Sequence, residues 1–344
     1  MDERIDFEDA IASQPRWMTK TAQVVDETLS ARGLPGWTVL GPHRRASLAV
    51  VGMGASTHAG AVFVAALRAA GVRAVNLDAS AAAGWPDRFH VADVALVISE
   101  SGRSPEPIAA ARRLGVPVTA VTNVLNSPLG QIADLVVPLG GFTDSGVYTI
   151  GYTTTLVALA ALARAAGIDA VPAPAGLADV AQTALADFAA PARALARRLV
   201  DCRFMDVVGR GTSLGSAQAV GLLMREAAHV PTTAFETVQY LHGPMESAAP
   251  DGCTLLFGDG RERAIAAQLR ASGMPAIQVL TTPDASADGE DVYRLSKPAE
   301  GYAGAVAEII FAQLLAAELA KLRKIQVGAW RFPQPDTKLP VGAA

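Results

Sequence analysis

The sequence predicts an α/β protein built from two similar units, each a doubly wound parallel sheet covered by helices on both faces. Three observations lead to this prediction. Short apolar strands alternate with alanine-rich helices along the 344-residue chain. Turns rich in glycine and hydroxyl groups follow the strands. The second half of the chain repeats the first, with Gly209 standing 157 positions after Gly52. Strands that are apolar throughout and joined by helices are typical of parallel sheets.

Residues 1–34 are expected to form a helical segment outside either sheet. Apolar residues recur at helical spacing over residues 7–32, and we expect the helix to break at Pro15 because proline cannot donate a backbone hydrogen bond. No strand accompanies this helix. We therefore expect it to pack across a domain or against a partner subunit.

The remaining chain divides into four further segments. They are the first sheet unit at residues 35–170, a linker and helix at 171–200, the second sheet unit at 201–327, and a tail at 328–344. Within the first unit we expect strands at 49–51, 74–77, 94–98, 118–123 and 135–139, and a closing apolar helix at 152–166. A run rich in proline at 171–176 marks the linker.

The stretch after the strand at 94–98 is the strongest candidate for a binding site. Three serines, Ser99, Ser101 and Ser104, surround Gly102, and a helical pattern follows at once. Backbone N–H groups at a helix start and serine hydroxyls all donate hydrogen bonds to an anion. The alternative is an ordinary strand-to-helix turn with Ser104 as the helix N-cap. Three hydroxyls exceed what a cap requires, so we favour an anion site.

A second turn has similar character. Gly52 and Gly54 follow the first strand, and Ser56 stands at the start of the next helix. Ligands of parallel sheets bind at the carboxyl ends of strands, where both turns lie. The dinucleotide fingerprint is incomplete because Thr57 occupies the place of its third glycine, although Asp78 stands where a ribose-binding acid would. The pattern therefore favours a phosphate ester smaller than a dinucleotide.

The second unit repeats the first strand and turn but lacks the serines. Gly258-Asp259-Gly260 replaces them, and an aspartate repels phosphate, so this unit is expected to have a different task. Glu226 near the end of a helix and His242 before Gly-Pro are candidate acid–base groups. By position alone, a solvated acid on a helix face and an ordinary turn histidine are equally open.

Composition excludes several other classes of function. The net charge is −4 and the sequence pI is about 5.8, without a cluster of Lys and Arg, so nucleic acid is not an expected partner. Cys202 and Cys253 lack metal-binding spacing, and no metal is expected. No signal peptide is visible, and we expect no apolar stretch of the roughly 18 residues that a membrane span needs. These features predict a cytoplasmic protein without membrane contact.

Residues 99–106 resemble the S-x-S-G-x-[ST]-x-E signature of sugar isomerase (SIS) domains. Arg210-Gly211-Thr212 and Leu241-His242-Gly243-Pro244 are similar to motifs in the second domain of tandem SIS proteins. This family includes the isomerase half of glucosamine-6-phosphate synthase, type-II glucosamine-6-phosphate deaminases and deglycases of Amadori products. The resemblance covers residues 7–339. It implies two tandem SIS domains, each a three-layer αβα sandwich of the flavodoxin type.

The resemblance also implies a sugar 6-phosphate ligand and a set of site residues. Glu226 would move a proton between C1 and C2, His242 would open the sugar ring from across a homodimer interface, and Lys338 would match the lysine of the tail. No cofactor is implied. The residues implied in phosphate binding are Ala55 and Glu100 through their backbone, and Ser56, Ser99, Ser101 and Ser104 through their side chains.

Several departures from the synthase pattern narrow the expected activity. Its glutaminase half is absent from this sequence, and Ala219 and Leu223 replace a glutamate and a lysine. The run 145–153 lacks the lysine of the synthase, and 235–244 is more similar to the deglycase motif. We expect an enzyme that opens a phosphorylated amino sugar or ketosamine and releases ammonia or an amine, leaving a hexose 6-phosphate. The alternatives are a plain aldose–ketose isomerase and a non-catalytic sugar-phosphate sensor.

Overall fold

The computed structural model describes residues 4–87, 89–169, 171–282, 289, 291–332, 334 and 336–340. The chain forms two compact units, each assembled from three segments. We call the first the N-sheet unit. It comprises Arg16–Thr143, Ile150–Ala178 and Trp330–Ala344. The second, the C-sheet unit, comprises Met1–Pro15, Asp144–Thr149 and Asp179–Ala329. Each unit therefore contains one continuous stretch with its strands and short segments from elsewhere in the chain.

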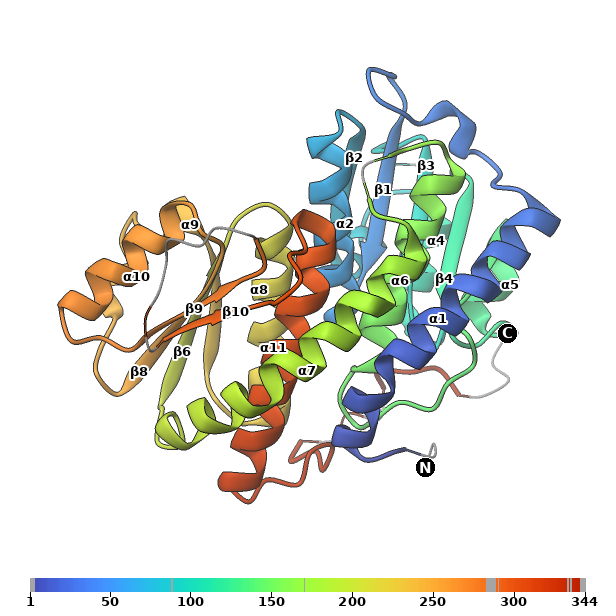
Figure 1. Cartoon of the computed structure of the whole chain (residues 1–344). Helices are drawn as coiled ribbons and strands as arrows, with labels where there is room; N and C mark the ends of the chain where they lie inside the picture. Colours follow the sequence, from blue (N-terminus) through green and yellow to red (C-terminus); the bar gives the residue numbers. More distant parts are fainter. Residues whose placement is uncertain are drawn as a thin grey trace. The chain divides into compact units, whose positions relative to one another are not determined.

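The N-sheet unit contains a five-stranded parallel sheet in the order β2-β1-β3-β4-β5. Helices α2 and α6 contact one another on one face, and α3, α4 and α5 cover the other (Figure 1). All residues of β3 and β4 are buried, as expected for strands covered on both sides. The elements are β1 (Ser47–Gly52), α2 (Ala55–Ala69), β2 (Arg73–Asp78), α3 (Ala79–Ala83), β3 (Val94–Ile98), α4 (Pro105–Leu114), β4 (Val118–Thr122), α5 (Pro128–Ile132), β5 (Leu135–Pro138) and α6 (Ile150–Ala165).

The C-sheet unit has the same topology, with its strands in the order β10-β9-β8-β6-β7. Numbered along the chain from β6, this order matches that of the N-sheet unit, so the predicted duplication is confirmed. Helices α8 and α11 pack together on one face, while α9 and α10 contact the strands from the other. The elements are α7 (Pro174–Arg198), β6 (Phe204–Gly209), α8 (Thr212–Ala227), β7 (Thr232–Glu236), α9 (Thr237–Tyr240), β8 (Gly252–Phe257), α10 (Arg261–Ala271), β9 (Ala276–Leu280), β10 (Val292–Arg294) and α11 (Gly301–Leu322).

The predicted break at Pro15 is wrong, because α1 (Phe7–Arg32) is one continuous helix. Pro15 has no N–H to donate to the carbonyl of Ile11, which would normally leave that acceptor unpaired. The side-chain amide of Gln14 donates to this carbonyl at 3.0 Å and to Oε1 of Gln313 in α11 at 2.8 Å. Both glutamines are fully buried. A buried side chain therefore replaces the missing backbone donor, and the helix continues.

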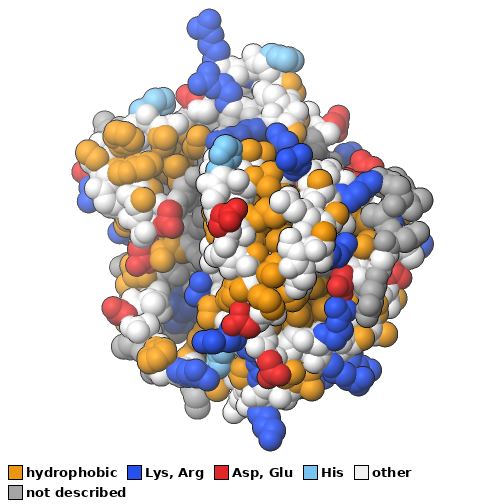
Figure 2. Space-filling model, turned by 90° about the vertical axis from the view of Figure 1, so that its left-hand side faces the viewer, with side chains coloured by type: hydrophobic (Ala, Val, Ile, Leu, Met, Phe, Trp, Pro, Cys, Tyr) orange, Lys and Arg blue, Asp and Glu red, His pale blue; other side chains and the backbone are white. Residues whose placement is uncertain are grey.

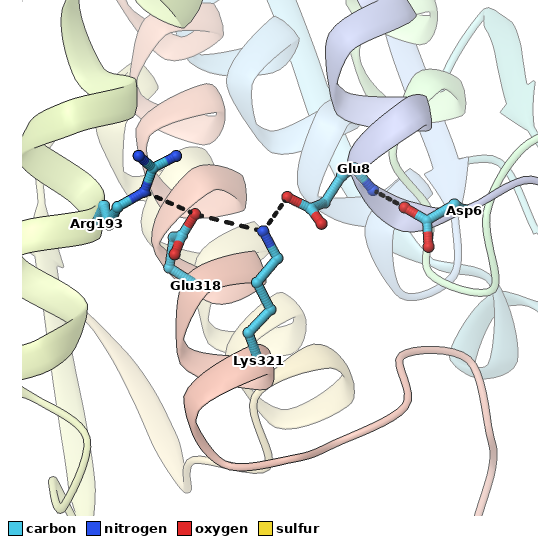
Figure 3. Close-up of polar contacts among 5 residues, drawn as sticks. All are labelled: Asp6, Glu8, Arg193, Glu318 and Lys321. Atoms are coloured by element: carbon cyan, nitrogen blue, oxygen red, sulfur yellow. Dashed lines mark hydrogen bonds and ion pairs between the residues drawn. The ribbon is translucent and has the colours of Figure 1, made fainter.

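Ion pairs join the first turn of α1 to α7 and α11 within the C-sheet unit (Figure 3). Lys321 pairs with Glu8 and lies 3.5 Å from Glu318, which is 3.4 Å from Arg193. The carboxylate of Asp6 accepts a hydrogen bond from the backbone N–H of Glu8 at 2.8 Å. Exposed ion pairs of this kind typically stabilise a protein by less than about 1 kcal/mol each. Their effect here is to orient the N-terminal end of α1.

One expectation about apolar stretches is also wrong. Helix α11 is long and apolar enough to cross a membrane by length and composition alone. However, 83% of its apolar window is buried inside the protein, where it packs on α8. Burial of this extent is what the core helix of a folded domain shows.

Candidate functional site

The serine-rich stretch forms a tight turn between β3 and α4, which we call the phosphate turn (Ser99–Ser104). Gly102 has a φ of +61°, and its N–H donates to the carbonyl of Ser99 at 3.0 Å. A Cβ atom at this position would lie 2.0 Å from Oγ of Ser127. Only glycine can adopt this backbone conformation and also lie this close to Ser127. The turn therefore has one fixed shape, with its hydroxyls at the carboxyl edge of the sheet.

Residues after β4 brace the phosphate turn from the side. The backbone N–H of Asn123 and the hydroxyl of Thr122 both donate to the carbonyl of Glu100, at 2.8 and 3.0 Å. The amide of Asn123 also reaches Oε1 of Glu100 at 3.3 Å, and Leu129 N–H donates to the carbonyl of Gly102 at 3.0 Å. The sequence pattern did not predict a role for these residues at the turn. The polar pair Thr122 and Asn123 at the carboxyl end of the strand is the signal that could have predicted this role.

The hydroxyls of the turn favour an anion site over an ordinary helix cap. Ser104 is the N-cap residue of α4, yet its side chain makes no capping hydrogen bond. Ser101 Oγ accepts a weak hydrogen bond from the N–H of Arg103 at 3.3 Å, which leaves its own proton available to a ligand. Ser99 is 5% exposed, at the base of the turn. The capping interpretation therefore does not account for these serines.

The turn after β1 lies beside the phosphate turn. Strands β1 and β3 are neighbours, with Val51 paired to Val97, and the strand order reverses between them. Ala55 and Ser56 open α2 directly after β1, and Ser56 is 8% exposed. The carboxyl ends of strands at such a reversal form the usual ligand crevice of an open α/β sheet. The fold thus brings all six predicted phosphate-binding residues to one edge of the N-sheet.

The tail is attached to the phosphate turn. The N–H of Leu339 donates to the carbonyl of Arg103 at 2.9 Å, and its side chain packs on the buried cluster under α4. Lys338 precedes this anchor and its side chain is exposed. The structure therefore places Lys338 next to the phosphate turn within the same unit.

In the C-sheet unit, the equivalent position is filled by a carboxylate of the protein. Only three residues join β8 to α10, where six join β3 to α4. The side chain of Glu262 folds over this loop, with Oε2 3.1 Å from the ideal Cβ position of Gly258 and 3.4 Å from that of Gly260. Thr237 at the start of α9 donates its hydroxyl to Oε1 of Glu262. The carboxylate of Glu262 therefore lies over the loop that corresponds to the phosphate turn of the N-sheet unit.

A second buried acid, Glu308, binds the serine of the C-sheet unit that corresponds to Ser56. Ser213 stands 157 positions after Ser56, but its hydroxyl donates to Oε1 of Glu308 at 2.6 Å. Glu308 is 2% exposed, and its Oε2 has no hydrogen-bond partner among the described residues. Burial raises the pKa of Glu308 to about 7. The signal in the sequence that could have predicted this role is a carboxylate, Glu308, within the most apolar part of a long helix.

This raised pKa predicts how stability depends on pH. Between its ordinary pKa near 4.5 and about 7, folded Glu308 holds a proton that the unfolded chain has lost, so its contribution to stability falls as pH rises through this window. We expect Glu308→Gln to raise the unfolding temperature at pH 8 relative to the original chain, with a smaller gain at pH 5. Thermal unfolding against pH measures this. Asp179→Asn, at an exposed site of α7, is the control, and an equal gain at both pH values would contradict the prediction.

Glu226 lies in the last turn of α8. It is half-buried, and desolvation raises the pKa of its carboxyl to about 7. The neighbouring Arg225 donates through Nε to the carbonyl of Thr232 at 2.9 Å, which ties this end of α8 to the start of β7. A carboxyl group with a pKa near neutral pH exchanges protons readily in both directions, as a proton shuttle must.

His242 follows α9 in a turn, as predicted, and its side chain is exposed. Helix α9 begins at the carboxyl end of β7, whereas Glu226 lies near the start of that strand. The 14 helical steps of α8 from Thr212 to Glu226 span roughly 21 Å, at about 1.5 Å per residue. The two candidate catalytic residues therefore lie at opposite edges of the C-sheet, and one chain does not bring them together.

Three further titratable residues, His58, Cys202 and Cys253, are buried or mostly buried. Burial lowers the pKa of His58 to about 4, so this histidine is uncharged at neutral pH. Cys202 and Cys253 are buried free thiols. Among the described residues, no group of three or more His, Cys, Asp or Glu side chains is arranged to hold a metal ion.

The comparisons with known proteins agree with this fold. No family model matches the sequence. A glutamine–fructose-6-phosphate aminotransferase (isomerizing) of Pyrobaculum aerophilum is 30% identical over 225 residues, which cover 60% of this chain and 36% of that protein. The chain thus matches about a third of the length of this curated relative.

Two solved structures cover nearly the whole chain. The C-terminal domain of glucosamine-fructose-6-phosphate aminotransferase from Francisella tularensis has a TM-score of 0.78 at 18% identity, covering 95% of this chain and 98% of that one. Glucosamine-6-phosphate deaminase from Thermotoga maritima has a TM-score of 0.72 at 17% identity, covering 94% and 96%. Together with the duplicated topology, this likeness defines the class as a two-domain α/β protein with SIS folds. The chain therefore has two SIS-like domains, and 60% of it is similar in sequence to part of the Pyrobaculum aminotransferase.

Proposed function

We propose that this protein is a sugar-phosphate isomerase that acts on a phosphorylated amino sugar or ketosamine and releases ammonia or an amine. The observation that carries the proposal is the phosphate turn, whose hydroxyls and helix start fit a phosphate at the strand-order reversal of the N-sheet. The near-neutral pKa of Glu226 supports acid–base chemistry on the sugar. The names of the related proteins support a hexose 6-phosphate as the substrate class.

The proposed reaction is a proton transfer followed by hydrolysis. His242 assists ring opening by moving a proton from the anomeric hydroxyl to the ring oxygen; this hydroxyl is O1 in an amino sugar and O2 in a ketosamine. In an amino sugar, the Glu226 carboxylate takes the proton from C2 and returns it to C1, which converts the aldehyde and amine to a ketose imine. In a ketosamine it takes the proton from C1 and returns it to C2. Water then adds to the imine and releases the amine, leaving a hexose 6-phosphate. The phosphate does not react, so its binding energy serves to position the reacting carbons.

The reaction is tested with two substrates. We expect the protein to release ammonia from glucosamine 6-phosphate or an amine from a fructosamine 6-phosphate, with a stoichiometric amount of hexose 6-phosphate. Interconversion of glucose 6-phosphate and fructose 6-phosphate, without amine release from the other two compounds, would identify a plain aldose–ketose isomerase instead. Binding without turnover or exchange on any of these compounds would favour a sugar-phosphate sensor.

The phosphate turn predicts the effect of removing one hydroxyl. Ser101→Ala should weaken the binding of hexose 6-phosphates by roughly 10- to 100-fold, because a hydrogen bond to a charged group contributes about 1.5–3 kcal/mol. Thermal stability should change little, since Ser101 is not a core residue. Calorimetric titration measures the affinity, and an unchanged dissociation constant would remove Ser101 from the site.

The separation of Glu226 and His242 supports a site shared between two copies of the chain. Around His242, Val238 is 41% exposed, and Leu241 and Met245 are only partly buried. Figure 2 shows hydrophobic side chains gathered on the side of the molecule where α9 and α10 lie in Figure 1. We therefore expect a two-fold symmetric homodimer, in which the partner supplies His242. A monomer in light scattering at micromolar concentration would contradict the shared site.

A mixture of two inactive variants gives a sharper test. Glu226→Gln and His242→Ala are unfolded together, refolded, and assayed. Half of the resulting dimers should be mixed, and each mixed dimer regains one site with both original residues, so about a quarter of full activity should return. If both residues acted from the same chain, the mixture would stay as inactive as its components.

A further inference from the structure

Arg103 is the cationic residue within the phosphate turn, and the turn's own contacts fix its backbone. Its N–H donates to Ser101 Oγ at 3.3 Å, and its carbonyl accepts from Leu339 N–H at 2.9 Å. The preceding Gly102 is held in the left-handed conformation. The side chain of Arg103 therefore extends from a backbone position that has little freedom, between Gly102 and Ser104.

The side chain of Arg103 has an unmet hydrogen-bonding requirement. Its Nε is shielded from solvent, and it has no hydrogen-bond partner among the described residues. The acids closest in sequence are Glu100, whose Oε1 accepts from Asn123, and Glu106 in the first turn of α4. Neither forms an ion pair with Arg103 within the described ranges. A buried N–H donor without an acceptor is costly, and such groups are rare unless a water, ion or ligand completes them.

We propose that Arg103 is a further phosphate-binding residue, whose guanidinium provides positive charge and N–H donors to the phosphate ester held by the turn. This inference rests on the proposed sugar-phosphate site. Guanidinium groups match the oxygens of a phosphate through two parallel hydrogen bonds. The serines and backbone N–H groups are neutral donors, so Arg103 gives this turn a preference for a charged phosphate over an uncharged sugar substituent.

The other arginines nearby have different roles. Arg113 on α4 pairs with Asp87, and Arg112 on the same helix is exposed to solvent. Arg112 therefore carries the same charge in the same unit without belonging to the turn. This makes Arg112→Gln a matched control for Arg103→Gln.

The experiment is a calorimetric titration with inorganic phosphate and with fructose 6-phosphate. We expect Arg103→Gln to weaken both by roughly 10- to 100-fold, Arg103→Lys to weaken them less, and Arg112→Gln to leave them unchanged. The affinity gap between the original protein and Arg103→Gln should narrow as sodium chloride rises from about 50 mM to about 500 mM, because salt screens charge–charge attraction. A structural role for Arg103 would not produce this change with salt.

Two results would overturn this inference and leave the proposed function intact. One is an Arg103→Gln protein that binds phosphate as the original does, and the other is a loss of affinity that is independent of salt. If the original protein binds neither phosphate nor fructose 6-phosphate, the proposed function itself fails. The two failures are therefore distinguishable.

Discussion

Glu226→Gln should lower turnover by roughly two to four orders of magnitude while sugar-phosphate affinity stays nearly constant. Glutamine keeps the size of the side chain and can still donate and accept hydrogen bonds, but it cannot take a proton from carbon. A general base typically contributes about 10²–10⁴-fold to the rate. Initial rates measure turnover, and incorporation of solvent deuterium at C1 or C2 reports on the proton transfer independently.

The pH dependence gives a second readout of the same residue. Because burial raises the pKa of Glu226 to about 7, the rate in the original protein should rise with pH up to this value as the carboxylate forms. Glu318→Gln is the matched control, an identical change at a partly buried acid of α11 in the same unit, and should keep full turnover. Normal turnover and exchange in Glu226→Gln would remove this residue from the mechanism.

Gly102→Ala should abolish tight phosphate binding and destabilise the N-sheet unit. The left-handed conformation costs alanine about 1–2 kcal/mol, and forcing an extra atom into a packed site adds about 1–3 kcal/mol. The added Cβ would overlap both Oγ and Cβ of Ser127, at 2.0 and 2.4 Å. Relief requires the turn to move, which displaces the serines. Denaturant unfolding and phosphate titration measure the two effects.

Gly71→Ala separates conformational strain from the steric overlap. Gly71 also has a positive φ, +77°, but nothing lies within 4 Å of its ideal Cβ position. We expect this variant to be destabilised only by the left-handed backbone conformation and to bind phosphate normally. Adding Ser127→Gly to Gly102→Ala should recover part of the affinity, because it removes the overlapping atoms. Equal effects of Gly102→Ala and Gly71→Ala would show that the close approach to Ser127 is unimportant.

The pattern of the sequence was sufficient to predict the fold class, the N-sheet strands and the position of the serine-rich turn between β3 and α4. Strands such as β3 are apolar throughout, and the hydroxyls of Ser99, Ser101 and Ser104 follow directly in the chain. The strand and the turn can therefore be predicted from residues that are close together in the sequence. The repeat at 157 positions likewise predicted the duplicated topology. The short strand β10 and the polar brace at Thr122 and Asn123 were missed, because their roles depend on neighbours distant in sequence.

Only the tertiary structure showed where contacts with residues distant in the sequence override the local sequence pattern. Pro15 predicts a helix break, but Gln14 supplies the missing donor and is itself held by Gln313, 299 positions away. The sheet direction places Glu226 and His242 at opposite edges although only 16 positions separate them. The pKa of Glu226 is raised to about 7 by burial, which the residue type alone does not predict. Spacing along the chain encodes local conformation, whereas burial and partnership arise from contacts that form only when the chain folds.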